Sequence, residues 1–155
     1  MRIAPWAAAL LVAACAADGR HAHHAAAAAA HGPDTRVAVR FPERLRSHTL
    51  AEMRDHLATL QRIEEALGRA EYDAAARLAE ERLGLSSLEA HGAHEVAPYM
   101  PPGMQEAGMA MHRAASRFAI EATNAGVTGD ARPAMGALAE VTARCVACHA
   151  AYRLE

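Results

Sequence analysis

A C-x-x-C-H string close to the C-terminus constrains this chain more than any other feature of its sequence. The string consists of Cys145, Cys148 and His149 in a chain of 155 residues. Two thiols at this spacing can add to the two vinyl groups of one porphyrin, while the imidazole that follows binds the iron. On a helix the three residues stand at i, i+3 and i+4, so they share one face. The string therefore predicts one covalently attached haem c, with His149 as an axial iron ligand.

Other roles of a C-x-x-C pair find less support in the sequence. A redox dithiol of the thioredoxin type is expected within a βαβ pattern, and a structural zinc site needs further ligands at finger spacing. The sequence offers neither feature, and the third cysteine, Cys15, lies near the N-terminus. Two ordinary buried thiols remain as the last alternative.

Composition favours a single all-α domain. The chain is 52% hydrophobic but only 4% aromatic, and no window alternates Val, Ile, Thr and aromatic residues as strands do. The length fits one domain. All 16 basic residues are arginine and the formal net charge is −2, which does not favour a nucleic-acid partner.

Residues 1–17 have the pattern of a secretory signal peptide. Arg2 precedes an apolar run from Ile3 to Ala14, and small residues follow it. We therefore expect a periplasmic protein. The end of this run, Val12 to Cys15, also resembles a bacterial lipobox, in which the cysteine becomes a lipidated N-terminus. A soluble protein and a protein with a lipid anchor at Cys15 both remain open.

Residues 18–39 form a low-complexity segment rich in alanine and histidine. Its histidines are His21, His23, His24 and His31. A tract without fixed geometry seldom binds a metal selectively, so a linker is favoured over a metal site. The folded domain is expected to span residues 40–155.

Four amphipathic helices are predicted within residues 40–155. Pro42 and Gly68 bound the first, and Gly84 ends the second. Pro102 opens the third, Asn124 to Gly129 closes it, and Asp130 is a candidate N-cap of the fourth. Short connections favour an antiparallel up-down four-helix bundle, whose core can accept a flat cofactor. The residues expected to face inward are, in chain order, Leu50, Met53, Leu57, Leu60, Ile63 and Leu67; Tyr72, Ala75, Leu78, Ala79 and Leu83; Met104, Gly108, Met111, Ala115, Phe118 and Ala122; and Leu138, Val141, Cys145, Cys148 and Tyr152.

The haem itself should form much of this core, because the chain has so few aromatic residues. A buried porphyrin adds several hundred Å² of apolar contact, of order ten kcal/mol at about 25 cal/mol per Å². Haem-free protein is therefore expected to be poorly ordered.

The closing segment resembles that of the class II c-type cytochromes, also called the cytochrome c-prime family. Arg144 precedes the C-x-x-C-H string, and Tyr152 and Arg153 follow His149 by three and four positions, as an aromatic and a basic residue do in the family. The resemblance implies a four-helix monohaem cytochrome, with Arg144 and Tyr152 among the residues around the haem. Arg144 and Arg153 flank the attachment site and can pair with the propionates or remain solvated.

A weaker similarity to the same family covers the junction between the first two predicted helices. It rests on Gly68 and on the run from Tyr72 to Ala75. The family often pairs through these two helices, so a homodimer is one expectation for this chain.

Family members differ in what occupies the sixth position of the iron. Members with a methionine there carry electrons, whereas members with an apolar residue there bind nitric oxide or carbon monoxide. Met53 in the first predicted helix is the favoured ligand, with His48 and His56 as competitors. Counting back from Gly68, as in five-coordinate members, reaches Glu52 instead.

Ligation by His149 and Met53 would raise the reduction potential, because a thioether stabilises ferrous iron. We therefore expect an electron carrier that meets other redox proteins through small, transient contacts, with a five-coordinate gas binder as the alternative. The sequence shows no nucleophile and base pair, phosphate loop or carboxylate dyad, so no enzymatic turnover is predicted.

A second group of ligand-type residues lies between and within the second and third predicted helices. Imidazole and thioether side chains suit copper, and the group comprises His91, His94, Met100, Met104, Met109, Met111 and His112. If copper binds there, the protein is a haem protein that also handles or senses metal. The alternative is a loop over the end of the bundle, with methionines as core residues.

Overall fold

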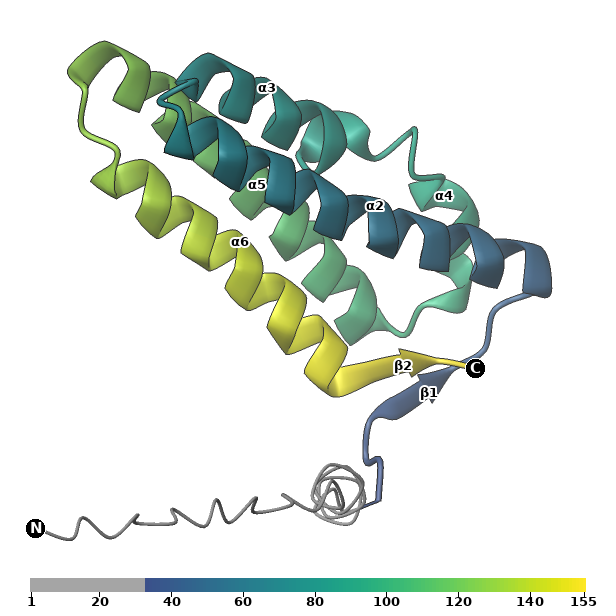
Figure 1. Ribbon diagram of the computed structural model, residues 1–155. Coiled ribbons are helices and arrows are strands. Elements are labelled where there is room, and N and C mark those ends of the chain that lie inside the picture. Colours follow the sequence, from purple (N-terminus) through teal and green to yellow (C-terminus); the bar gives the residue numbers. More distant parts are fainter. Residues whose placement is uncertain (1–32) are drawn as a thin grey trace, which may run out of the picture. The chain divides into compact units, whose positions relative to one another are not determined.

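Four of the five α-helices in the computed structural model, which describes residues 33–155, occupy the segments that the apolar periodicity predicts (Figure 1). The compact, mostly helical unit runs from Arg36 to Glu155. Its elements are β1 (Val37–Val39), α2 (Glu43–Gly68), α3 (Tyr72–Arg82), the 3₁₀ turn η1 (Leu85–Ser87), α4 (Ala93–Val96), the 3₁₀ turn η2 (Ala97–Tyr99), α5 (Pro102–Thr128), α6 (Arg132–Ala151) and β2 (Tyr152–Leu154).

Proline and glycine set the ends of α5, as predicted. Pro102 begins the helix, where its missing N–H has no intrahelical partner to lose. Gly129 ends it in the left-handed conformation (φ 73°) and donates its N–H to the carbonyl oxygen of Ala125 at 2.8 Å. Asp130 lies one residue before the cap position of α6, and its carboxylate accepts the N–H of Arg132 at 3.0 Å.

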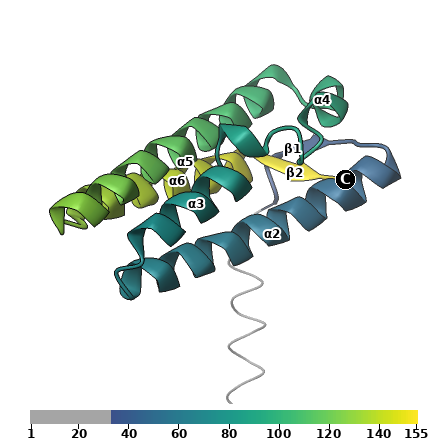
Figure 2. The same cartoon turned by 90° about the horizontal axis from the view of Figure 1, so that it is seen from above.

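α5 is the centre of the packing. It packs closely against α3 and against α6, and α2 packs closely against α3 (Figures 1 and 2). Alanines such as Ala115 and Ala122 are fully buried in α5, and small side chains let helix axes approach closely. Phe118 is the largest fully buried side chain. α2 and α6 are not closely packed against each other.

The buried stripe of α2 differs from the predicted one. Ile63 is fully buried as expected, but Leu57 is 70% exposed, and Met53 is half-buried. The prediction that Leu57 faces inward is therefore wrong. His56 and Thr59 are buried instead, because this face of α2 meets polar side chains of the segment between α3 and α5.

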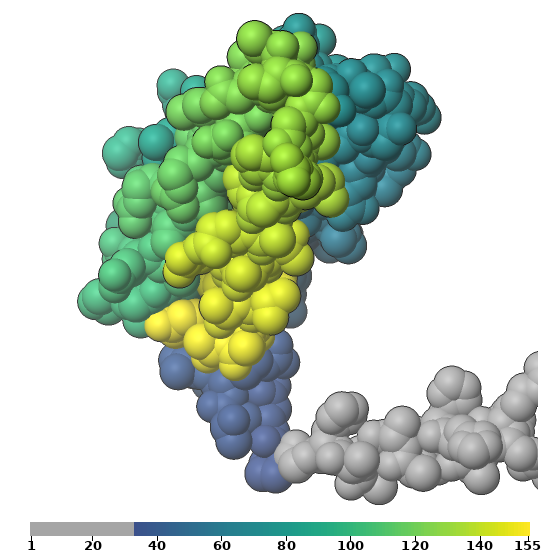
Figure 3. Space-filling view, turned by 90° about the vertical axis from the view of Figure 1, so that its left-hand side faces the viewer, coloured from purple at the N-terminus to yellow at the C-terminus, as the bar shows by residue number. Residues whose placement is uncertain are grey.

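Two three-residue strands depart from the all-α expectation. β1 and β2 pair in parallel, with Val37 opposite Tyr152, and the N–H of Glu155 donates to the carbonyl oxygen of Val39 at 3.0 Å. In the space-filling view the residues before α2 lie directly against the end of the chain (Figure 3). Tyr152 is thus in a strand rather than in the last helix, and residues 36–39 belong to the folded unit rather than to the predicted linker.

The strand pair closes a small second core. Its buried residues are Val39, Phe41, Leu45 and Val96, and Tyr152 packs against them. A β-carbon at Gly103, at the start of α5, would lie 2.5 Å from the Tyr152 hydroxyl oxygen, so glycine permits the tyrosine to approach. Strands of three residues are too short to produce an alternating pattern, which explains why the sequence did not predict them.

Within residues 33–155, every helix falls short of the length and apolarity that crossing a membrane demands. The predicted signal peptide, Cys15 and the histidines of residues 21–31 lie outside the described residues.

Phe118→Ala should lower the free energy of unfolding by about 3–5 kcal/mol, because it opens a cavity in the tightly packed centre of α5. Ile120→Ala is the matched control on the same helix: Ile120 is 61% exposed, and the change should stay within about 0.5 kcal/mol. Urea denaturation followed by far-ultraviolet circular dichroism measures both. Equal destabilisation by the two substitutions would contradict the packing described here.

Candidate functional site

The C-x-x-C-H string lies entirely on α6, in its last turns. Cys145 and Cys148 are free, half-buried thiols. Cys145 packs against the main core, which is the cluster of buried residues that α2, α3, α5 and α6 share around Phe118. Leu138 and Val141, earlier on the same helix, are buried in that core. His149 is exposed at the helix end. The two thiols and the imidazole therefore occupy consecutive turns of one helix, as predicted.

Burial governs the state of the two thiols. It raises the pKa of Cys148 and, together with the neighbouring Cys148 sulfur, that of Cys145. Both side chains are therefore protonated at neutral pH and are not joined in a disulfide. Such thiols remain available for thioether formation rather than acting as reactive thiolates.

The residues that flank the string have partners of their own. Arg144 forms an ion pair with Glu140 one turn earlier on α6. Arg153 on β2 lies 3.0 Å from a carboxylate oxygen of Glu155. Tyr152 is half-buried in the second core. These contacts do not test whether either arginine pairs with a haem propionate. That pairing stays a prediction.

Met53 and its two competitors lie on α2 in different surroundings. Met53 is half-buried on the flank of the buried stripe. Nε2 of His48 lies 3.1 Å from the carbonyl oxygen of His91, and since a carbonyl oxygen can only accept, Nε2 is the donor. His56 is 8% exposed and lies against the ring of His91. Both histidines are thus engaged with the segment between α3 and α5.

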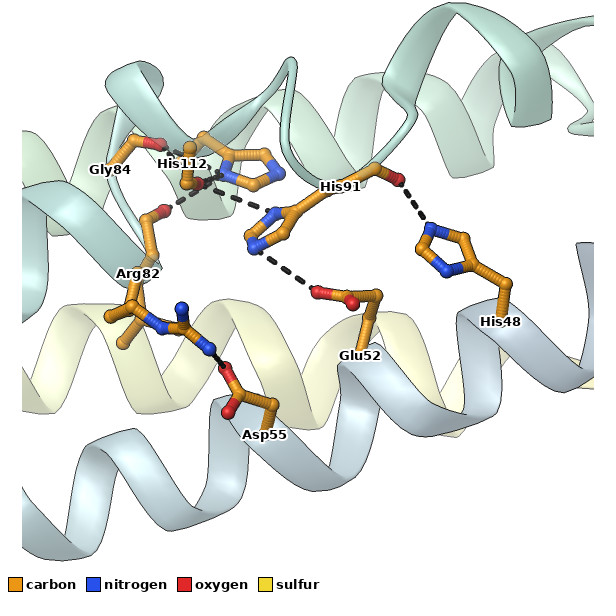
Figure 4. A network of polar contacts seen from close by, with 9 residues as sticks. His48, Glu52, Asp55, Arg82, Gly84, His91 and His112 are labelled. Atoms are coloured by element: carbon orange, nitrogen blue, oxygen red, sulfur yellow. Dashed lines mark hydrogen bonds and ion pairs between the residues drawn. The ribbon is translucent and has the colours of Figure 1, made fainter.

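Four ionisable side chains meet between α2, α5 and the segment joining α3 to α5. We call Glu52, His56, His91 and His112 the histidine cluster. Nε2 of His91 lies 3.3 Å from Oε2 of Glu52 (Figure 4). The ring centroid of His91 lies 4.8 Å from that of His56 and 5.5 Å from that of His112. Ligand atoms of Glu52, His56 and His91 all lie within 4.8 Å of one another.

Backbone geometry brings His91 into this cluster. Gly92, directly after it, has a left-handed conformation (φ 62°) that few other residues adopt without strain. His48 on α2 forms a hydrogen bond with the carbonyl oxygen of His91 (Figure 4). A β-carbon at position 92 would lie 3.4 Å from Nε2 of His48, which leaves little space for a side chain there.

Hydrogen bonds determine which ring nitrogens carry protons. Nδ1 of His112 faces the carbonyl oxygens of Leu83 at 2.8 Å and Gly84 at 3.2 Å, so it must be the protonated donor. The Ser87 hydroxyl donates to the Gly84 carbonyl oxygen at 2.7 Å and therefore accepts from Nδ1 of His91 at 3.3 Å. In the neutral rings Nε2 of both histidines consequently holds a lone pair.

The cluster disfavours protonated imidazoles. Burial, followed by the neighbouring His91 and His112, lowers the pKa of His56 to about 4, against an opposing effect of Asp55. Burial also lowers the pKa of His91, which Glu52 opposes, and that of His112. His56 is therefore neutral at pH 7, and its Nε2 has no hydrogen-bond partner among the described residues.

The sequence indicated all four residues of the histidine cluster, but in other roles. Glu52 and His56 entered as alternative haem-side positions, and His91 and His112 as copper ligands beside methionines. In the structure Met111 lies in the main core, whereas Met100 and Met104 pack against the second core. His94 is exposed. The i, i+4 spacing of Glu52 and His56 was the available sequence signal for a shared face.

Comparison of this chain with protein-family models, with curated proteins and with solved structures finds no match in any of the three.

Stability should fall as the pH is lowered from 7 to 5 in the presence of a chelator. The folded pKa of His56 is about 4 and its ordinary value is 6.5, so within this window the unfolded state binds more protons. One such histidine contributes at most about 1.4 kcal/mol per pH unit. His56→Gln should flatten the dependence.

Urea denaturation at several pH values measures this effect. His94→Gln is the matched control, because His94 is exposed and belongs to the segment that carries His91. If His56→Gln and the parent protein lose stability equally between pH 7 and pH 5, the burial of a neutral His56 is refuted.

Proposed function

We propose that this chain is a periplasmic monohaem c-type cytochrome that carries single electrons on an antiparallel up-down four-helix bundle. The observation that carries the proposal is the C-x-x-C-H string in the last turns of α6, with two half-buried, unpaired thiols. Cys145 and Cys148 would form the thioether bonds, and His149 would be an axial ligand.

The donor set fits a c-type haem. Three residues at i, i+3 and i+4 share one helix face, and the protonated state of the two thiols matches their addition to vinyl groups. The bound haem supplies reversible one-electron chemistry at its iron. The role of α6 is to hold Cys145 against the core, with Cys148 half-buried one turn later and His149 exposed at the helix end.

The apolar surface of α2 also supports the proposal. Leu57 is 70% exposed and Met53 is half-buried. Other apolar residues of the same helix, such as Ile63, are fully buried. α2 is not closely packed against α6, which carries the attachment residues. A porphyrin in contact with both helices would bury this surface, at about 25 cal/mol for each Å² of apolar area removed from water.

Met53 is the sixth ligand that the surroundings favour. Its competitors already have other partners: His48 contacts the His91 carbonyl group, and His56 lies against the rings of His91 and of His112 on α5. A thioether ligand from Met53, together with His149, would stabilise ferrous iron and favour electron transfer over gas binding.

Protein exported with a c-type haem maturation system should keep one haem after denaturation and extraction in acidified acetone, and its mass should rise by one haem. The double substitution Cys145→Ser and Cys148→Ser should abolish the covalent attachment. Val146→Ala is the control, because Val146 lies between the two cysteines and is 62% exposed, without a role in the bonds. Parent protein that carries no covalent haem under these conditions would refute the proposal.

The ferrous protein should give a low-spin spectrum that carbon monoxide leaves unchanged, because Met53 fills the sixth position. Met53→Ala should give a high-spin spectrum that shifts on addition of the gas. Arg54→Ala, directly after Met53 on α2 and exposed, should behave like the parent protein. A parent protein whose spectrum shifts with carbon monoxide would contradict Met53 ligation and support the five-coordinate, gas-binding alternative.

A further inference from the structure

We propose that Glu52, His56 and His91 form a binding site for one divalent transition-metal ion, with Zn²⁺ as the ion that fits this donor set. Two imidazoles and one carboxylate are typical ligands of zinc. The ligand atoms already lie within 4.8 Å of one another. None of these residues belongs to the C-x-x-C-H string, so the site is independent of haem attachment.

One edge of the coordination shell has the required length. Zinc bonds to nitrogen and oxygen of about 2.0–2.2 Å place two ligands of a tetrahedral ion about 3.3 Å apart. Nε2 of His91 and Oε2 of Glu52 are separated by 3.3 Å (Figure 4). Since hydrogen bonding assigns the proton of neutral His91 to Nδ1, two lone pairs face each other across this distance. A cation between them removes their repulsion.

His56 supplies an independent indication. Its side chain is 8% exposed, and Nε2 is buried without a hydrogen-bond partner among the described residues. An unpaired buried nitrogen is costly, because it has lost its hydrogen bonds to water. Coordination of a metal ion beside Glu52 and His91 would satisfy it.

The surrounding hydrogen bonds resemble those that orient metal-binding histidines. Such a histidine usually donates its second N–H to a carbonyl, carboxylate or water, which fixes the ring and its lone pair. Nδ1 of His91 donates to the Ser87 hydroxyl at 3.3 Å, and that hydroxyl donates to the Gly84 carbonyl oxygen at 2.7 Å. His91 is thus already held with Nε2 directed to Glu52.

The site would connect parts of the fold that otherwise make limited contact. Glu52 and His56 belong to the middle of α2, which packs closely against α3 alone among the helices of residues 33–155. His91 belongs to the segment between α3 and α5. A bound ion would therefore fix α2 to this segment and stabilise the folded chain by mass action.

Isothermal titration of Zn²⁺ into the chelator-treated, haem-loaded full chain tests the proposal. The parent protein should show one tight, saturable equivalent, and His56→Ala and His91→Ala should weaken this phase at least tenfold. His94→Ala is the matched control and should retain it. The histidines of residues 21–31 are common to all these proteins, so binding to them contributes equally.

Zinc-edge X-ray absorption of the parent protein loaded with one equivalent gives a second measurement that needs no variant. It should show a four-coordinate shell of nitrogen and oxygen that includes imidazole. Absence of the tight equivalent in the parent protein overturns the proposal, and so does its full retention in folded His56→Ala and His91→Ala.

Discussion

The packing of α5 against α3 and α6 is the interaction on which the rest of the structure depends. Fully buried alanines line these contacts, and Phe118 fills their centre. Because small side chains permit close approach, three helices form a dense core with few aromatic residues. The remaining long helix, α2, packs against α3. Side chains near the middle of α2 also contact the segment between α3 and α5.

This arrangement determines what α2 and α6 can contribute to function. α6 is held by α5, so the half-buried sulfur atoms of Cys145 and Cys148 have a rigid support. α2 presents Leu57 and Met53 on a flank that is not part of the core. Under the proposed function the haem joins these two helices. The histidine cluster joins α2 to the segment between α3 and α5.

Local signals in the sequence predicted the elements that local chemistry controls. Pro102 and Gly129 fixed the ends of α5, and the C-x-x-C-H spacing placed Cys145, Cys148 and His149 on one helix face. The rotation of α2 about its axis was not predictable in this way. Apolar periodicity alone predicts that Leu57 is buried and His56 exposed, and the structure shows the reverse. The burial of His56 becomes favourable only through polar side chains that lie elsewhere in the sequence.

The features that the sequence missed depend on contacts between distant residues. His56 and His91 meet through tertiary packing, and no spacing rule links them. The pairing of β1 with β2 joins the two ends of the folded unit through three residues each, too few to show a strand pattern. The sequence could therefore identify candidate ligands, but not which of them share a site.

Hydrogen exchange of the α2 backbone amides tests most directly whether a covalent haem on α6 completes the fold. Haem-loaded protein should be compared with haem-free protein made in the cytoplasm, both treated with chelator. The amides of Glu43–Gly68 should be protected with haem and exchange rapidly without it. Equal protection of α2 in the two proteins would show that α2 needs no haem, and would contradict the central role given to the C-x-x-C-H string.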